Sequence, residues 1–489
     1  MEMYLSLVVI FIIYCILLFF DMFFKTCAHY PYIRFLDGTG FKIKPLQIDW
    51  TTKAFNRLLI RFGNKHPWFW EVWFTLGLYV SLVLLPISTY YLFTSFFQNF
   101  SSSVSSNVIT IEPIVPGINL PLSELGYYSF SLVLCSIVHE AGHALAAVRE
   151  NVNLECVGIN IIFILPIAYV ILGTEKLFSL KNNKILKILC AGVWHNIVLS
   201  LVAYSLYLLL PHLFSFVYHV NQGVTVTQIS KFSPLLGPRG LKVGDAITKI
   251  NDCEVYNEES WVNCIKSIHT RKSGFCVHTD IVHDLDESIP LKHLDNGYLD
   301  CCKPDKQNFC FENVDSVSSD GILKMPSHVC LPARTIVEKT VHFCSFEPHE
   351  CPDDLFCFRP LIENYTNLFK IVKSDNSNVI YSGPVLDVYR TVDISPFIIN
   401  LIFNTTFIAD VTMKVLKYIT IFSLGLAIIN VIPCWFMDGQ YIINILGSIG
   451  LLNSLGKKKT QLSVFLITTL FTFVLIFHCL FNLWKMLAS

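Results

Sequence analysis

The chain has 489 residues, of which 53 % are apolar and 15 % charged, and this composition excludes an ordinary soluble protein. Its 36 Lys and Arg nearly balance its 37 Asp and Glu, so the charge implies no general attraction to nucleic acid. The composition predicts a polytopic α-helical membrane protein, whose partners are the lipid bilayer and proteins embedded in it.

Residues 1–98 are predicted to form two membrane spans separated by a basic segment. The first span, residues 4–20, has no basic stretch before it and no small-residue cleavage site after it, which indicates a retained anchor rather than a removed signal peptide. Residues 24–67 carry eight Lys and Arg against two Asp, and the positive-inside rule predicts that this segment is cytosolic. The second span runs from Trp68 to Phe97.

A Ser-rich lumenal loop is predicted at residues 99–125. The sequence SSSVSSN at 101–107 is typical of a flexible segment. It follows a possible N-glycosylation sequence at Asn99, and others occur at Asn364 and Asn404. These sequences agree with a lumenal position for the parts of the chain that carry them.

The apolar run from Tyr127 to Val148 contains the pattern His139-Glu140-Ala-Gly-His143. Residues four apart lie on one face of a helix, so His139 and His143 can converge on one ion. Tetrahedral zinc binds imidazole nitrogen, and a neighbouring glutamate can take a proton from the zinc-bound water, which is the H-E-x-x-H chemistry of metalloproteases. The alternative is a polar patch near the membrane interface, although each ionisable group costs about 2.5–3.5 kcal/mol at the centre of a spanning helix.

A catalytic zinc ion needs a third protein ligand. The extended metzincin motif is excluded, because Ala146 and Arg149 stand where that motif needs Gly and His. Glu150 and Glu155 are too close in sequence to fold back easily onto the motif. Asp438, which precedes a glycine after a later apolar helix, is the best remaining candidate. The alternative for Asp438 is a turn or helix-capping role.

An interrupted apolar run and a long apolar helix follow the motif. The run from Val157 to Leu172 contains Pro166 and is short for a span, so we expect a re-entrant or surface-lying element. The helix from Ile188 to Leu210 contains Asn196, which could hydrogen-bond into the site or link two helices. We expect His195 beside it to be a packing residue.

The polar domain at residues 221–392 is predicted to be rich in strands. Its first half alternates apolar and polar residues between turn glycines. The stretch from Gly240 to Asn251 resembles a PDZ domain, a module that binds an extended peptide as an added strand. The alternative is a small β-domain without a ligand.

Ten of the 17 cysteines lie in this polar domain, and their density predicts disulfides and therefore an oxidising compartment, which we interpret as a lumen. Zinc is the competing explanation, but the C-x-x-C pairs of a zinc ribbon are missing. The pairing cannot be deduced from the sequence. The cysteine-rich part, about 264–357, is interpreted as an insertion in the PDZ-like domain or a neighbour of it.

Residues 393–489 are predicted to return the chain to the membrane. A helix from Met413 to Ile432 leads to Asp438 through a proline, and irregular backbone at membrane depth is expected to be buried in protein or to line a cavity. Three consecutive lysines then mark the cytosolic side, and a last span runs from Leu462 to Trp484. We expect this part and residues 126–215 to form one catalytic membrane core.

Four motifs together give the chain a close resemblance to a known family. They are H-E-A-G-H in a membrane helix, Gly192-x-x-x-Asn196 in the next long one, the PDZ-like cysteine-rich domain, and N-x-x-P-x-x-x-x-D-G, which begins at Asn430. In this combination the chain resembles the site-2 protease family of intramembrane zinc metalloproteases, and the Ser-rich loop is similar to its animal branch. Family members usually have Leu where Met437 stands, and these two residues have similar volumes.

The resemblance implies an enzyme whose zinc ligands are His139, His143 and Asp438 and whose catalytic base is Glu140, with one Zn²⁺ per chain. It also implies the substrates: single-span, membrane-anchored transcription factor precursors of the sterol regulatory element-binding and stress-sensor types, already cut once on the lumenal side. Cleavage within the transmembrane helix would release the cytosolic portion in the Golgi.

A substrate helix must unwind before cleavage, because its carbonyls are occupied by internal hydrogen bonds. Asn196, Asn430 and Pro433 are suited by their positions to bind the unwound segment. Two other classes compete with the protease. A polytopic metal transporter or carrier is expected to show internal repeats, and the sequence has none. A non-catalytic membrane chaperone would not need all four residues of the zinc site.

Overall fold

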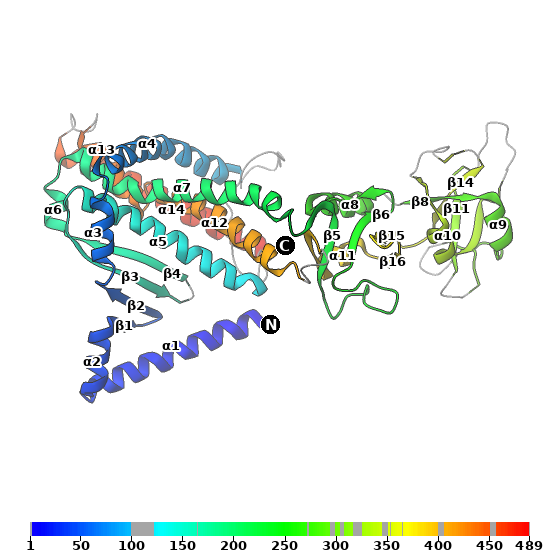
Figure 1. Ribbon diagram of the computed structural model, residues 1–489, viewed down its shortest axis with the longest axis horizontal. Helices are drawn as coiled ribbons and strands as arrows, with labels where there is room; N and C mark the ends of the chain where they lie inside the picture. The colour runs from blue at the N-terminus through cyan, green and yellow to red at the C-terminus, as the bar shows by residue number, and fades with distance from the viewer. Residues whose placement is uncertain are drawn as a thin grey trace. The chain divides into compact units, whose positions relative to one another are not determined.

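The computed structural model describes the chain except residues 1, 99–121, 164, 271–272, 294–298, 304–307, 316–324, 345–350, 353, 364, 400–404, 450–455 and 489. The chain divides into two compact units (Figure 1). Unit 1 comprises Met1–Leu208 and Thr412–Ser489, and unit 2 comprises Leu209–Val411. The predicted glycosylation sites at Asn99, Asn364 and Asn404 and nearly all of the Ser-rich loop lie outside the described residues.

Unit 1 is mainly helical. Six helices in the described part of the chain are long and apolar enough to cross a membrane, and they lie in α1 (Glu2–Thr26), α4 (Pro67–Gln98), α5 (Leu125–Arg149), α7 (Asn182–Phe214), α12 (Phe407–Val431) and α14 (Lys457–Ala488). The shorter helices are α2 (Tyr30–Thr39), α3 (Asn56–Asn64), η1 (Leu122–Glu124), α6 (Thr174–Phe178) and α13 (Asp438–Ile449). Every predicted span coincides with one of the six long helices, so the polytopic helical class is confirmed.

The interrupted apolar run after the motif forms strands. It folds into the antiparallel hairpin of β3 (Leu154–Ile162) and β4 (Leu165–Leu172). The hairpin joins β1 (Phe41–Lys44) and β2 (Gln47–Thr52) in a four-stranded sheet with the order β1-β2-β3-β4. Pro166 lies in the edge strand β4, where its missing N–H interrupts no ladder of hydrogen bonds. The run therefore makes no helical crossing, and the basic segment before α4 contributes half of this sheet.

Helix α3 packs directly on the C-terminal end of α5. A Cβ atom built on Gly63 would lie 2.9 Å from Val148 Cγ1 and 3.4 Å from the Leu145 carbonyl oxygen, so only a glycine permits this approach. The indole Nε1 of Trp70 on α4 donates to the Phe62 carbonyl at 3.1 Å. The first contact joins α3 to the helix that carries the H-E-x-x-H motif, and the second joins α3 to α4.

Unit 2 contains two larger sheets. The first has six strands, in the order β16-β15-β6-β5-β17 with β7 paired to β6, and packs with α8 (Glu258–Thr270) and α11 (Val385–Thr391) around one core. Its strands are β5 (His219–Ile229), β6 (Ala246–Ile250), β7 (Cys253–Glu254), β15 (Asn367–Lys373), β16 (Asn378–Gly383) and β17 (Val392–Ile398).

The second sheet of unit 2 has five strands in the order β12-β11-β14-β8-β13. Its strands are β8 (Gly274–His278), β11 (Asn308–Asn313), β12 (His328–Pro332), β13 (Phe343–Cys344) and β14 (Leu355–Pro360), and a two-stranded sheet, β9 (Lys292–His293) with β10 (Leu299–Asp300), accompanies them. Helices α9 (Thr279–Leu285) and α10 (Ala333–Lys339) complete this part. In sequence the second sheet lies between β7 and β15 of the first, as expected of an insertion.

The ten cysteines of unit 2 form five disulfides, which confirms the predicted disulfide-bearing region. The pairs are Cys253–Cys264, Cys276–Cys351, Cys301–Cys310, Cys302–Cys330 and Cys344–Cys357. The sulfur atoms of Cys276, Cys344 and Cys351 lie within 4.8 Å of one another, but each belongs to a disulfide and so cannot bind a metal ion as a thiolate.

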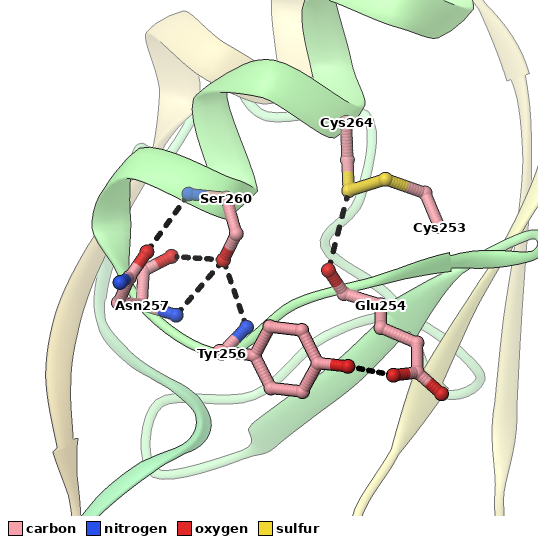
Figure 2. The surroundings of a disulfide bond; sticks show 6 residues. All are labelled: Cys253, Glu254, Tyr256, Asn257, Ser260 and Cys264. Carbon is pink, nitrogen blue, oxygen red and sulfur yellow. Dashed lines mark hydrogen bonds between the residues drawn. A yellow bond between two sulfur atoms is a disulfide. The ribbon is translucent and has the colours of Figure 1, made fainter.

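Figure 2 shows the disulfide that ties α8 to the first sheet. Asn257 caps α8: its Oδ1 accepts from the Ser260 N–H at 2.9 Å, and the Ser260 hydroxyl accepts from the Asn257 N–H at 2.9 Å. Cys264 lies on this helix and pairs with Cys253 of β7. Cys264 therefore belongs to the part of unit 2 that is built around the first sheet, and the strands of the second sheet begin only at Gly274.

Candidate metal centre

The two histidines of the motif lie on one face of α5, four residues apart and buried. Their Nε2 atoms are 3.1 Å from each other. Asp438, the first residue of α13, places its Oδ2 atom 3.0 Å from His139 Nε2 and 3.2 Å from His143 Nε2. The fold thus brings together the three predicted ligands, although Asp438 is 299 residues from His139 in sequence.

The break between α12 and α13 puts Asp438 in this position. Pro433 follows the end of α12 and prevents the helix from continuing. A Cβ atom on Gly439 would lie 2.3 Å from the Ile432 carbonyl oxygen, so the glycine lets α13 start directly against the end of α12. Between them, the backbone N–H of Trp435 donates to the Thr472 hydroxyl on α14 at 2.9 Å, and its indole donates to Thr469 at 3.3 Å.

The donor set and the space around it fit a zinc ion. Two imidazole nitrogens and one carboxylate oxygen are ligands that zinc binds at about 2.0–2.1 Å, which places tetrahedral ligands about 3.3 Å from one another. The three observed separations, 3.0, 3.1 and 3.2 Å, are close to this value. Gly192 on α7 leaves the space open, because its Cβ would lie 2.3 Å from His143 Nε2 and 2.7 Å from His139 Nε2.

The second ring nitrogen of each histidine lies within hydrogen-bond distance of a neighbouring residue. His143 Nδ1 lies 2.8 Å from the Ile188 carbonyl oxygen, and His139 Nδ1 lies 3.2 Å from the Asn196 amide nitrogen. The Asn196 Oδ1 atom is buried and has no partner among the described residues. A histidine that binds metal through Nε2 carries its proton on Nδ1, and Asn196 with its amide turned over would present Oδ1 as the acceptor.

Asn196 differs in its surroundings from Asn430 and Pro433, the other two residues predicted to bind substrate. Asn196 is fully buried behind the His139 ring, which favours orienting that ring over contacting a substrate. Asn430 on α12 is half-buried, and its side chain makes no hydrogen bond to any residue that the structure describes. Pro433 is buried in the helix break. Of the three, Asn430 alone combines partial exposure with unused hydrogen-bonding groups.

Glu140 lies beside the ligands and is held by the edge strand β4. Its Oε2 accepts from the Val170 N–H at 3.0 Å, and Ser136, one turn earlier on α5, accepts from the Ala168 N–H at 2.8 Å. A carboxylate oxygen of Glu140 and nitrogens of His139 and His143 lie within 4.8 Å of one another. At this spacing a water molecule between Glu140 and the ligands can hydrogen-bond to the carboxylate.

Residues outside the motif also shape the centre. His195 packs against Trp73 and Phe74, with its Nδ1 2.7 Å from the Ala191 carbonyl oxygen, which is the packing position expected for it. In the sequence, Gly192 stands out only as part of the Gly192-x-x-x-Asn196 motif, and nothing there indicates that it lies close to both histidines. No sequence pattern pointed to Thr472, because its contact with Trp435 depends on how α14 packs.

Two comparisons with known proteins agree with this geometry. A relative from Arabidopsis thaliana, named membrane-bound transcription factor site-2 protease homolog, is 28 % identical over 311 residues, which are 59 % of this chain and 58 % of the relative. The match thus spans less than two thirds of that relative. The family model of peptidase family M50 matches residues 127–475, from the start of the motif helix to within the last span. Since this match covers well over half of the sequence, the chain belongs to peptidase family M50.

Proposed function

We propose that the chain is an intramembrane zinc metalloprotease. The observation that carries the proposal is the convergence of His139, His143 and Asp438 on one point, with Glu140 beside it. Membership of peptidase family M50 supports proteolysis, and the six long apolar helices support a site within the membrane. His139, His143 and Asp438 would hold the ion, and Glu140 would act on the attacking water.

A zinc ion held by this donor set would supply Lewis acidity, making a water molecule acidic at neutral pH and polarising the scissile carbonyl group. Glu140 would act as general base, accepting a proton from the attacking water, and as general acid when it delivers that proton to the leaving amine. The hydrogen bond from Val170 to Oε2 fixes the carboxylate while the other oxygen, which has no partner among the described residues, exchanges the proton. Asn430 would bind carbonyl or amide groups of the substrate segment that has unwound.

The substrates that we propose are single-span, membrane-anchored transcription factor precursors, including those of the sterol regulatory element-binding and stress-sensor types. The name of the Arabidopsis relative supports this class. Cleavage in the transmembrane helix after a first lumenal cut would release the cytosolic portion, in the Golgi. The disulfide-bearing unit 2 would then face the lumen, and its PDZ-like part would exclude uncut precursors or bind the new chain end.

Reconstitution with a model single-span substrate tests the proposed reaction. We expect cleavage within the transmembrane segment that stops on treatment with a zinc chelator and resumes when zinc is added. Glu140→Gln should lower the cleavage rate by at least about 100-fold while zinc content stays unchanged, because proton transfer by a positioned group contributes about 10²–10⁴-fold. Glu155→Gln, an exposed glutamate of β3, serves as the control. Cleavage that persists without zinc, or in Glu140→Gln, would contradict the proposal.

A further inference from the structure

The segment from Lys53 to Trp68, which we name the basic ledge, contains four cationic side chains and no carboxylate. Its cations recur at every fourth position: Lys53, Arg57, Arg61 and Lys65. All four are exposed, and no side chain in the described part of the chain forms an ion pair with them. Arg57 and Arg61 lie four residues apart on α3, where like charges repel one another, and no anionic side chain of the described residues offsets this repulsion.

The basic ledge also exposes large apolar side chains. Their exposed fractions range from 43 % to 80 %, and they are Phe55, Leu58, Ile60, Phe62 and Trp68. If this surface faced water, the exposure of these apolar side chains would cost free energy. At the surface of a bilayer, apolar side chains enter the acyl boundary while lysine and arginine remain among the headgroups.

Helix α3 sorts these residues onto separate faces. Leu59 and Gly63, four residues apart, share the face that packs on other parts of unit 1. Leu58 and Phe62 share the exposed apolar face, and Arg57 with Arg61 shares the cationic face. Three such faces are what a helix needs when it lies in the membrane interface beside a transmembrane helix.

We propose that the basic ledge lies in the membrane interface and binds the headgroups of anionic lipids through its four cations. The combination of charge with exposed apolar side chains favours a lipid surface over a soluble acidic partner, which would need the charge alone. The contact between Gly63 and Val148 joins the ledge to α5, the helix that carries His143. The proposal does not depend on the protease reaction.

Lipid titration of the full chain tests this proposal without any measurement of activity. The purified protein in detergent is titrated with phosphatidylserine or with phosphatidylcholine, and bound lipids are counted by native mass spectrometry. We expect tighter binding of phosphatidylserine. In the variant Lys53→Gln/Arg57→Gln/Arg61→Gln/Lys65→Gln its Kd should rise by at least about tenfold, since each cation near an anionic surface contributes roughly a fivefold factor. Binding of phosphatidylcholine should not change.

Two further variants test whether a loss of lipid binding comes from the basic ledge itself, and not from a lower total charge or from misfolding. Lys231→Gln/Arg239→Gln/Lys242→Gln/Lys266→Gln removes four exposed cations of unit 2 and should leave the phosphatidylserine Kd unchanged. Arg57→Lys/Arg61→Lys keeps the charge and should keep the affinity. Equal affinity of the unaltered chain for both lipids would overturn the proposal, and so would an equal loss in the ledge and unit 2 variants.

Discussion

Gly192 shows how much the metal centre depends on one missing side chain. The residue lies on α7 opposite the motif helix, and any Cβ atom there would stand within 2.7 Å of ring atoms of both histidines. The far ends of the imidazole rings cannot retreat freely, because the Ile188 carbonyl oxygen and Asn196 hold their Nδ1 atoms. The space between the three ligand atoms is therefore kept open by a glycine.

We expect Gly192→Ala to abolish zinc binding, because the new methyl group would displace His143 Nε2 from the position where the ligands meet. Zinc per chain, measured by elemental analysis, should fall from one to near zero. Gly425→Ala on α12 is the matched control, since its Cβ would have nothing within 4 Å, and it should keep its zinc. A Gly192→Ala protein that retains a full equivalent of zinc would show that the space is not the metal position.

Asn196 gives a second prediction at the same scale. If it orients His139, Asn196→Ala should lower zinc affinity by about 10- to 100-fold, the usual effect of removing a group that positions a ligand. Competition with a chromophoric chelator measures the affinity. Ser200→Ala removes a buried hydroxyl of the same helix that donates to the Thr420 carbonyl, and we expect little change in affinity there. Equal affinities in the two variants would mean that Asn196 only links helices.

The three candidate ligands that the structure brings together could be chosen from their residue types and positions in the sequence, whereas the residues that support them could not. His139 and His143 follow from helical spacing, and Asp438 follows from being a carboxylate in apolar surroundings. The sequence does not distinguish the two roles of Asn196, because only the packing of α7 on α5 shows that its amide faces His139. The sequence gives no sign of which face of α7 meets the motif helix.

At the scale of elements, α14 helps to position Asp438, which lies on α13. The loop between α12 and α13 is attached to this last span through Trp435, whose ring also lies 5.7 Å from that of Phe465. Thr472 donates its hydroxyl proton to its own helix and accepts from the Trp435 N–H. The last span therefore fixes the loop that ends at Asp438.

We expect Thr472→Val, which keeps the side-chain shape but removes the acceptor, to lower zinc affinity about two- to tenfold, the worth of one hydrogen bond. Thr472→Ser retains the hydroxyl and should restore most of the affinity. The control is Thr468→Val, because Thr468 lies one turn earlier on α14, more deeply buried than Thr472, and its hydroxyl bonds only to its own helix. If Thr468→Val weakened zinc binding as much as Thr472→Val, the loop contact would have no special role.

The helices could be predicted more completely than the strands of unit 1. A long apolar run is sufficient evidence for a spanning helix, and all six occur. The hairpin of β3 and β4 was expected only as an element that does not cross, because a short apolar run does not distinguish strand from helix. Its pairing with β2, in which Trp50 lies opposite Ile159, joins residues more than 100 positions apart, and no local pattern encodes that register.

At the scale of the whole molecule, the five disulfides should contribute unequally to the stability of unit 2. Cys276 and Cys351 are 75 residues apart in sequence, whereas Cys301 and Cys310 are 9 apart. A crosslink restricts the unfolded chain more when it closes a longer loop, and the difference between these two amounts to about 2 kcal/mol. The pairing could not be predicted, because ten cysteines allow many connectivities. Even the strand register does not give it: Cys310 lies opposite Cys330 and Cys276 opposite Cys357, and all four are bonded to other cysteines.

We expect Cys276→Ala/Cys351→Ala to destabilise unit 2 by about 2 kcal/mol more than Cys301→Ala/Cys310→Ala. The free energy of unfolding can be followed in the full chain by proteolysis of unit 2 at increasing urea concentration. Zinc content should stay at one equivalent in both variants, since the ligands lie in unit 1. Equal losses of stability in the two variants would show that loop length does not govern these crosslinks.

The close contact of Gly63 with Val148 has a consequence for where a substrate would be cut. Because α3 and α5 are joined there, the proposed position of α3 in the membrane interface would set the depth of His143 in the bilayer. A helix advances about 1.5 Å per residue. The cut would therefore fall a set number of residues along the substrate helix, counted from the membrane surface on which α3 lies. We expect residues added at the opposite end of a substrate helix to leave the cut where it was, and residues added at the near end to shift it by the same count.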